Sequence, residues 1–176
     1  VPGSPPVILT IPDPEDRAAL EEDIRSARSQ ADVVVVSWHW GVSKNYRRVP
    51  YQMELGRAAI DAGASIVIGH HPHVLQGVEV YKKGVIFYSF GNFVFSLKPG
   101  GTPPSDRNTR LVDCEIDKSG IREMVLRPVR GNADLQPEVL RDGSASRCLE
   151  ALVKDSQEFA TSFRDEGDKL VLALGR

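Results

Sequence analysis

Two short apolar runs, each followed by histidine, constrain the fold of this chain most strongly. The first run spans residues 33–39 and ends at His39, and the second, Ile66–Ile68, stops at Gly69. Each run is too short for a buried helix and is rich in β-branched residues, so both are predicted to be strands. Because the runs are almost continuously apolar, we expect strands that are covered on both faces, as in a parallel sheet.

The stretch between the two runs has the character of a helix. Pro50 suits the first helical position, apolar residues then recur at helical spacing, and Gly63 is placed to end the helix in a left-handed conformation. An earlier helix is expected to begin after Asp13, which is an N-cap residue followed by proline. The order strand, helix, strand predicts an α/β fold in which ligands bind at the carboxyl edge of the strands.

Beyond residue 73 the apolar pattern changes to alternation with polar residues, which indicates hairpins. A further helix is predicted over 147–163, and a Pro- and Gly-rich loop over 97–108 is expected to be mobile and close to the histidines. Other expected strands cover 7–11, 78–81, 85–88, 112–116, 124–126 and 169–173.

Composition excludes several classes of protein. The 176 residues suffice for one domain, and the net charge of −2 with mixed signs argues against a nucleic-acid partner. No apolar stretch approaches the roughly 20 residues of a membrane span. Two cysteines, Cys114 and Cys148, make no disulfide framework, so two free thiols are expected. The first six residues resemble the interior of a longer chain or a trimmed end.

All four histidines follow the two predicted strands. Pro72 disfavours the α region for His71, so an extended backbone is expected there. In an extended segment His71 and His73 point the same way, towards His39, while His70 points elsewhere. Neutral imidazole is a common metal ligand and suits Zn, Mn or Fe. Spacing alone leaves a second interpretation open, namely a solvated histidine turn beside a structural His39.

Five sequence blocks, taken together, resemble the capsule-synthesis CapA-like family, which belongs to the calcineurin-like metallophosphoesterase superfamily. The resemblance is dense over 32–95 and looser on either side. The blocks are Val35-Val-Ser-Trp-His-Trp-Gly41, Pro50-Tyr-Gln52, Ile60-Asp-Ala-Gly-Ala64, Val67-Ile-Gly-His-His-Pro-His-Val-Leu-Gln76 and Phe87-Tyr-Ser-Phe-Gly-Asn-Phe-Val-Phe95.

The resemblance implies the C-terminal half of a β-sandwich, with two facing sheets flanked by helices and a site for two divalent metal ions (Mn, Fe or Zn). It implies that His39, His71 and His73 are metal ligands. His70 is the candidate catalytic residue, although relatives often carry serine there. Supporting positions implied around the site are Trp40, Ser43, Gly91 and Asn92.

Two of these supporting positions have a qualification. Ser43 stands where the family usually has glutamate, so the resemblance does not supply a carboxylate at that position. Asn92 is read equally well as a turn residue that tolerates left-handed geometry.

The resemblance also bears on the domain and its partners. It implies that residues 1–176 are the C-terminal part of a single domain, because nothing here matches the Asp-rich and Asn-His motifs of the family's N-terminal half. The expected partners are that N-terminal half or a swapped second copy, together with a phosphorylated or polyanionic substrate. A cell-surface or extracellular location is expected, and the residues themselves leave the cytoplasm open.

Three functions remain compatible with the sequence. The first is metal-dependent phosphoester hydrolysis, or poly-γ-glutamate capsule biosynthesis and export. The second is a non-catalytic module for capsule assembly or anchoring with a vestigial metal site. The third is a hydrolase with one zinc ion on His39, His71 and His73. The number of bound metal ions, two, none or one, distinguishes them.

Overall fold

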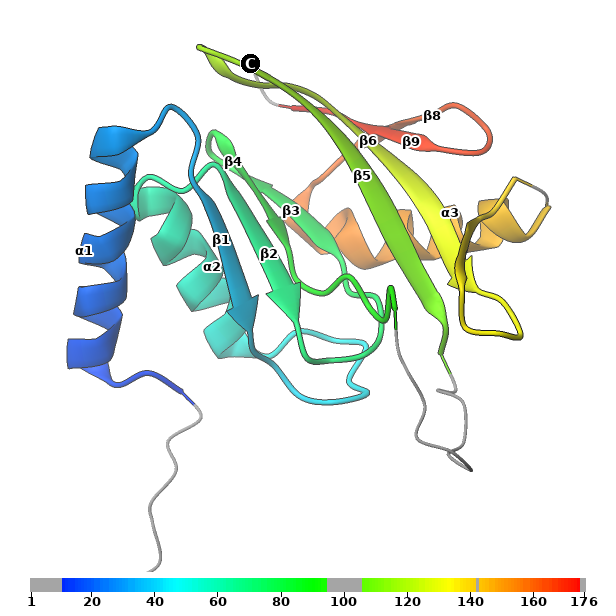
Figure 1. Cartoon of the computed structure of the whole chain (residues 1–176), viewed down its shortest axis with the longest axis horizontal. Coiled ribbons are helices and arrows are strands. Elements are labelled where there is room, and N and C mark those ends of the chain that lie inside the picture. The colour runs from blue at the N-terminus through cyan, green and yellow to red at the C-terminus, as the bar shows by residue number, and fades with distance from the viewer. Residues whose placement is uncertain (1–10, 95–105, 142, 175–176) are drawn as a thin grey trace, which may run out of the picture.

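The computed structural model describes residues 11–94, 106–141 and 143–174, and within them it contains three α-helices and two β-sheets (Figure 1). The predicted α/β class, with two sheets and flanking helices, is confirmed. In chain order the elements are α1 (Pro14–Gln30), β1 (Val35–His39), α2 (Pro50–Ala62), β2 (Ile66–His70), β3 (Val78–Tyr81), β4 (Gly84–Phe87), β5 (Asn108–Asp117), β6 (Gly120–Gly131), β7 (Pro137–Val139), α3 (Gly143–Ser156), the short 3-10 helix η1 (Gln157–Phe159), β8 (Phe163–Asp165) and β9 (Leu170–Leu172).

The first sheet has the strand order β1-β2-β4-β3. Strands β1, β2 and β4 are parallel, and β3 is antiparallel to β4. The register pairs His39 with His70 at the carboxyl ends of β1 and β2. The second sheet has the order β5-β6-β9-β8, with β7 also paired to β6. The predicted strand-helix-strand unit and both predicted hairpins are therefore present.

Residues at the helix ends explain where α1 and α2 begin and end. The Asp13 side chain accepts hydrogen bonds of 2.9 Å from the backbone N–H groups of Glu15 and Asp16, so it is the N-cap of α1. At the start of α2, the side chain of Gln52 accepts a 2.9 Å bond from the N–H of Val49. Gly63 ends α2 at φ +118°, in the left-handed region predicted for it.

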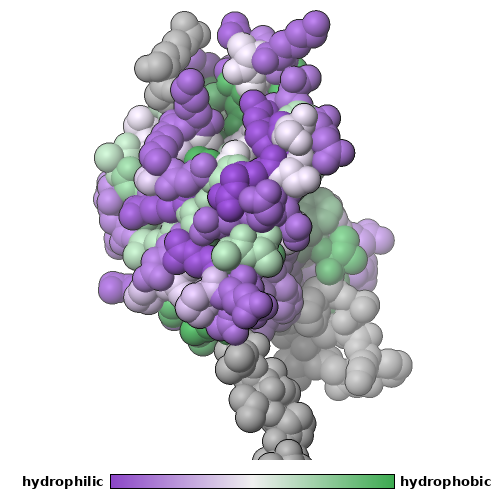
Figure 2. Space-filling model, turned by 90° about the vertical axis from the view of Figure 1, so that its left-hand side faces the viewer, coloured by the Kyte–Doolittle hydropathy of each residue, from purple (hydrophilic) through white to green (hydrophobic). Residues whose placement is uncertain are grey.

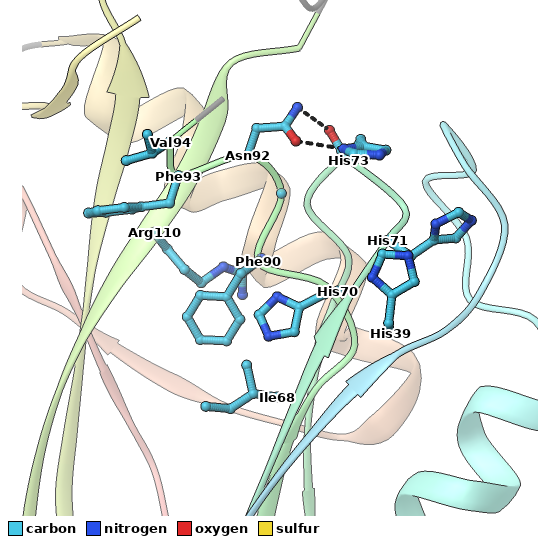
Figure 3. Close-up of a pocket in the computed structure, with 11 residues that line it drawn as sticks. His39, Ile68, His70, His71, His73, Phe90, Asn92, Phe93, Val94 and Arg110 are labelled. Carbon is cyan, nitrogen blue, oxygen red and sulfur yellow. Dashed lines mark hydrogen bonds between the residues drawn. The ribbon is translucent and has the colours of Figure 1, made fainter. Parts of the chain in front are cut away.

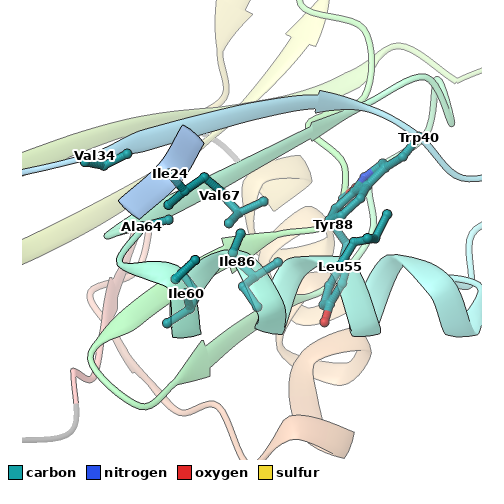
Figure 4. Close-up of a cluster of buried hydrophobic side chains, with 11 residues drawn as sticks. Ile24, Val34, Trp40, Leu55, Ile60, Ala64, Val67, Ile86 and Tyr88 are labelled. Carbon is teal, nitrogen blue, oxygen red and sulfur yellow. The ribbon is translucent and has the colours of Figure 1, made fainter. Parts of the chain in front are cut away.

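Helices α1 and α2 cover one face of the first sheet (Figures 1 and 4). Their apolar side chains pack against outward-facing residues of the parallel strands, which removes both from water. The buried residues of this cluster are Ile24, Val34, Trp40, Leu55, Ala59, Ile60, Ala62, Ala64, Val67, Ile86 and Tyr88.

The opposite face of the first sheet packs against the second sheet and α3. This layer is the interior of the sandwich, and it joins β2, β3 and β4 to β6 and β9. Its buried residues are Ile66, Val78, Val85, Phe87, Met124, Leu126, Leu149, Leu152, Leu170 and Leu172.

Strand β1 does not share in this interior. Its residues alternate in burial, with Val36 and Trp38 packed on the helices while Val35, Ser37 and His39 on the other face are exposed. The prediction that β1 is covered on both faces was therefore wrong for the described residues. The reason is its position at the edge of the sheet, where no described β1 residue belongs to the interior cluster between the sheets.

Two further expectations have clear outcomes. Cys114 and Cys148 are both free, as predicted. The helix predicted over 147–163 was wrong at both ends, because α3 starts at Gly143 and ends at Ser156, and the chain then turns through η1 into β8. Ala160, in the left-handed region at φ +54°, breaks the helical path after η1.

Two predicted segments lie largely outside the residues that the structure describes. The strand expected over 7–11 lies almost entirely outside the described residues, as does most of the loop over 97–108. None of the described helices has the length and apolar character needed to cross a membrane.

Gly69 is the point of closest approach in the first sheet. A Cβ atom on Gly69 would lie 2.2 Å from the carbonyl oxygen of Tyr88 and 2.3 Å from Nε1 of Trp40. Those two atoms share a hydrogen bond of 2.9 Å. We expect Gly69→Ala to lower the free energy of unfolding by roughly 1–3 kcal/mol, because the added methyl group must displace this bond or the backbone. Chemical denaturation measures the difference.

The matched control is Gly143→Ala at the start of α3, where an added Cβ meets nothing within 4 Å. It is expected to leave the free energy of unfolding within about 0.5 kcal/mol of the parent value. Equal stability of the two variants would contradict the close approach at Gly69.

Candidate functional site

Three parallel strands end at one edge of the first sheet, and the candidate site lies there. The backbone N–H of Trp40 donates to the carbonyl of His70 (3.1 Å), and that of Phe90 donates to the carbonyl of Gly69 (3.2 Å). These bonds hold the segments that follow the strands beside one another. The segments border a cavity of about 400 Å³ (Figure 3), lined by His39, Ile68, His70, His71, His73, Phe90, Gly91, Asn92, Phe93, Val94 and Arg110.

The structure brings the three predicted ligand histidines together. The ring centroids of His39 and His71 are 4.6 Å apart, and those of His71 and His73 are 6.0 Å apart. The backbone conformation that brings them together differs from the extended one that the sequence predicted. His71 and His73 have φ of +93° and +60°, so neither is extended as predicted. Pro72 lies in a tight turn, and its carbonyl accepts a 2.7 Å bond from the N–H of Lys44.

His70 occupies a different side of the same cavity. Its Nε2 lies 3.1 Å from the hydroxyl oxygen of Ser37, and its ring points towards Ile68 and Phe90, away from the other histidines (Figure 3). The His70 ring therefore points to a different part of the cavity from the rings of His71 and His73, although His39 is its neighbour on β1. Its assignment as a catalytic residue stays a prediction.

Asn92 contacts the site directly through His73. Its Oδ1 lies 2.7 Å from Nδ1 of His73, while its Nδ2 donates to the carbonyl of the same residue at 3.2 Å. Because the amide nitrogen is used by the carbonyl, the amide oxygen faces the ring and accepts from Nδ1–H. Nδ1 is then the protonated nitrogen of the neutral ring, which is the orienting arrangement typical of a metal-ligating histidine.

Gly91 allows this contact to form. It adopts φ +69°, and a Cβ atom there would lie 2.5 Å from the carbonyl oxygen of Asn108. Only glycine combines that conformation with so close an approach to the backbone of β5. Gly91 also pairs with Thr109 in an isolated bridge, so the segment carrying Asn92 is fastened to the second sheet.

The other two predicted supporting residues lie away from the cavity. Trp40 is buried among the residues beneath α2, where its Nε1 donates to the carbonyl of Tyr88 and its ring stacks on Tyr88 at 6.0 Å. Ser43 is exposed in the turn after β1. Neither residue lines the cavity among the described residues.

Arg110 of β5 lines the cavity and was missed by the sequence analysis. Only 4% of it is exposed, and its Nη2 donates to the carbonyl of Gln76 at 2.8 Å. A usable signal was present in the sequence. Val112 and Cys114 alternate with polar residues, and extending the alternation back by two positions places Arg110 on the same, inward-facing side of the strand.

The electrostatics of the cavity favour the neutral forms of His70 and His71 beside a positive charge. Burial and the neighbouring His39 lower the pKa of His70, and burial together with His39 and His73 lowers the pKa of His71. Burial lowers the pKa of Arg110 to about 9, so the guanidinium remains protonated at neutral pH. The described residues that line the cavity include no carboxylate.

The donor set fits only part of the metal centre that the sequence implies. Imidazole nitrogens suit Zn, Mn or Fe, but a pair of ions also needs hard oxygen ligands. Across residues 11–94, 106–141 and 143–174, no group of three or more His, Cys, Asp or Glu side chains is arranged to hold an ion. The described residues, with His39, His71 and His73 among them, therefore form neither a two-metal centre nor a three-ligand site for one ion by themselves.

The contact between Asn92 and His73 gives a testable result. In the parent chain we expect neutral His73 to be protonated at Nδ1, because the Asn92 oxygen accepts from that nitrogen. The variant Asn92→Ala removes the acceptor, so the Nε2-protonated form should gain population. Nitrogen-15 NMR of the histidine rings at about pH 8.5, where unperturbed imidazole is neutral, distinguishes the two forms.

Ser37→Ala is the matched control, because Ser37 contacts the ring of His70. It should alter the signals of His70 and leave those of His73 unchanged. An Nε2-protonated His73 in the parent chain would show that Asn92 does not orient the ring.

Comparison with known proteins places the chain in a family. The model of the family described as bacterial capsule synthesis protein PGA_cap matches residues 4–97, which is 94 of the 176 residues. The chain is 37% identical over 147 residues to the capsule biosynthesis protein CapA of Bacillus anthracis, covering 84% of this chain and 34% of that protein. It is 39% identical over 143 residues to the PGA biosynthesis protein CapA of Bacillus subtilis, covering 81% and 36%.

A more distant relative is a probable polyglutamine synthesis accessory protein of Mycobacterium tuberculosis, which is 29% identical over 92 residues, covering 51% of this chain and 24% of that protein. The chain thus spans about a third of the length of the two Bacillus relatives. The family match and the extent of these similarities show that this chain belongs to the bacterial capsule synthesis protein family PGA_cap.

Proposed function

We propose that this chain acts in the synthesis or export of a poly-γ-glutamate capsule, and that its histidine cavity binds a phosphorylated or polyanionic substrate. The family and the names of its Bacillus relatives support the first part. The observation that carries the second part is the clustering of His39, His71 and His73 at the carboxyl edge of parallel strands. Open α/β sheets bind their ligands at that edge.

In this proposal the three imidazoles are the nitrogen ligands of a divalent metal centre, with two ions of Mn, Fe or Zn in the complete domain. Asn92 orients His73 for that role. The carboxylate ligands come from outside the described residues, because the described lining of the cavity has none. A complete centre would support metal-dependent phosphoester hydrolysis, with His70 as the nearby candidate for proton transfer.

The source proposed for those carboxylates is a segment that adds to β1. Among the described residues β1 pairs only with β2, so its outer edge is open. Val35 on the uncovered face is 51% exposed, which is unusual for a strand residue facing a sandwich interior. The proposed partner is the N-terminal half of the same domain or the same half of a swapped second copy.

One observation favours a second candidate function. Because the described residues do not complete a metal-binding group, the chain is also compatible with a non-catalytic module for capsule assembly or anchoring that retains a vestigial site. Metal stoichiometry and activity separate this candidate from the first.

We expect the chain alone, with Mn or Zn, to hydrolyse an aryl phosphate little or not at all, because it lacks described carboxylates at the site. Adding the N-terminal half from a close relative should produce turnover, and His71→Ala should abolish that turnover. The measurement is the release of the aryl alcohol together with the metal content of each sample. Lys118→Ala, at an exposed hairpin turn, is the control expected to retain the turnover.

Two results would overturn this view. Robust turnover by the monomeric chain alone, abolished by His71→Ala, would favour a hydrolase that uses three histidines on one ion. Absence of both metal and turnover in the complemented sample would favour the non-catalytic module.

The open edge of β1 gives a separate prediction. Val35→Lys should change the free energy of unfolding of the chain alone by no more than about 0.5 kcal/mol, because Val35 is exposed. It should weaken association with the N-terminal half, since the lysine charge would be buried when that half pairs with β1 and covers this face of the strand. Sedimentation of the mixture measures the association.

Ile116→Lys is the matched control, because Ile116 is also an exposed β-branched strand residue, at 45%, but lies in the second sheet. Equal association of Val35→Lys and the parent chain would rule out β1 as the docking edge.

A further inference from the structure

Arg110 is a buried cation, and its guanidinium is only partly satisfied by hydrogen bonds to the described residues. Its Nε and Nη1 are buried and have no hydrogen-bond partner among the described residues. Only Nη2 has a hydrogen-bond acceptor among the described residues, the carbonyl of Gln76. The negative charge of Asp155 raises the pKa of Arg110 and opposes the effect of burial, but it supplies neither Nε nor Nη1 with a hydrogen-bond acceptor.

A structural role explains only part of this arrangement. Two contacts would hold Arg110 in place as a structural residue beside the site. One is the bond to the carbonyl of Gln76, and the other is the Phe90 ring, whose centroid lies 5.8 Å from the guanidinium carbon. A buried cation with unsatisfied N–H groups is costly, and replacement by an apolar side chain is often neutral or stabilising. A structural role therefore explains the hydrogen bond of Nη2, but it does not explain why Nε and Nη1 are buried without hydrogen-bond partners.

The surroundings of Arg110 point to a ligand. It lines the same cavity as the four histidines, which contribute no negative charge. Phe93 and Val94, with 43% and 72% of their surfaces exposed, also line the cavity and form its apolar wall. The site thus combines a buried cation with an apolar wall, which suits an oxyanion carried on a short aliphatic stem.

We propose that Arg110 is the anion-recognition residue of this cavity and binds an oxyanion of the ligand, a carboxylate or a phosphate, through Nε and Nη1. This inference rests on the proposed function, in which the ligand is polyanionic. Phe90 lies beside the guanidinium (Figure 3), with its ring centroid 5.8 Å from the guanidinium carbon. A glutamyl side chain matches the apolar wall as well as the cation, whereas inorganic phosphate matches the cation alone.

The first measurement uses the parent chain and follows the Nε–H signal of Arg110 by NMR. Two probes are titrated without added metal, a γ-linked triglutamate and inorganic phosphate. A saturable shift of the Arg110 signal with either probe supports the proposal, and the probe that produces it identifies the source of the oxyanion. No shift with either probe overturns it. This readout does not depend on a variant that folds.

The second measurement compares affinities by calorimetry. Arg110→Met keeps an apolar stem of similar length, and we expect it to weaken binding of the effective probe by about tenfold or more, the effect of losing charge-assisted hydrogen bonds. The control is Arg122→Met, because Arg122 is an exposed arginine paired with Asp117 on the β5–β6 hairpin. It should bind as the parent does. Unchanged affinity of a folded Arg110→Met would overturn the proposal.

These outcomes are separable from those of the proposed function. Loss of phosphoesterase activity in the complemented sample, with the Arg110 shift intact, would refute the catalytic proposal and leave the anion site standing. Turnover in the complemented sample without a shift of the Arg110 signal by either probe would support the catalytic proposal and refute the anion site. The face of the molecule on the α1 side, seen in Figure 2, is largely hydrophilic.

Discussion

The hydrogen bond from Trp40 Nε1 to the carbonyl of Tyr88 is the interaction on which the site edge depends. It spans β2 at Gly69, where a side chain of any size would collide with both atoms. The segment after β1 is thereby joined to the segment after β4 across the strand that carries the histidine turn. The indole ring is buried, so breaking this bond would leave a polar group unsatisfied in the core.

The site depends on contributions from both sheets. The first sheet supplies His39, His70 and the histidine turn at its carboxyl edge, and the second supplies Arg110 from β5. The segment with Gly91 and Asn92 connects them, since Gly91 pairs with Thr109 on one side and Asn92 bonds to His73 on the other. Packing between the sheets therefore sets the distance between the imidazoles and the guanidinium, and a change in that packing would change the chemistry of the cavity.

The open edge of β1 and the composition of the cavity lead to the same interpretation. Among the described residues β1 has an unpaired edge and an exposed inner face, and such a strand is a site for pairing with another segment. A cavity with imidazoles and a cation, but no described carboxylate, lacks the oxygen ligands of a two-ion centre. Since the chain spans about a third of its Bacillus relatives, the proposed partner segment accounts for both features.

The sequence alone determined the strand-helix-strand unit, the helix caps at Asp13 and Gly63, and the clustering of histidines at one edge, because hydrophobic periodicity and capping are local properties. Only the tertiary structure decided that His71 and His73 converge through left-handed turn residues, that β1 is covered on one face, and that Trp40 is buried away from the cavity. Arg110 shows the physical reason. Its strand is far from the histidines in sequence, and only the packing of one sheet on the other brings its charge to the site.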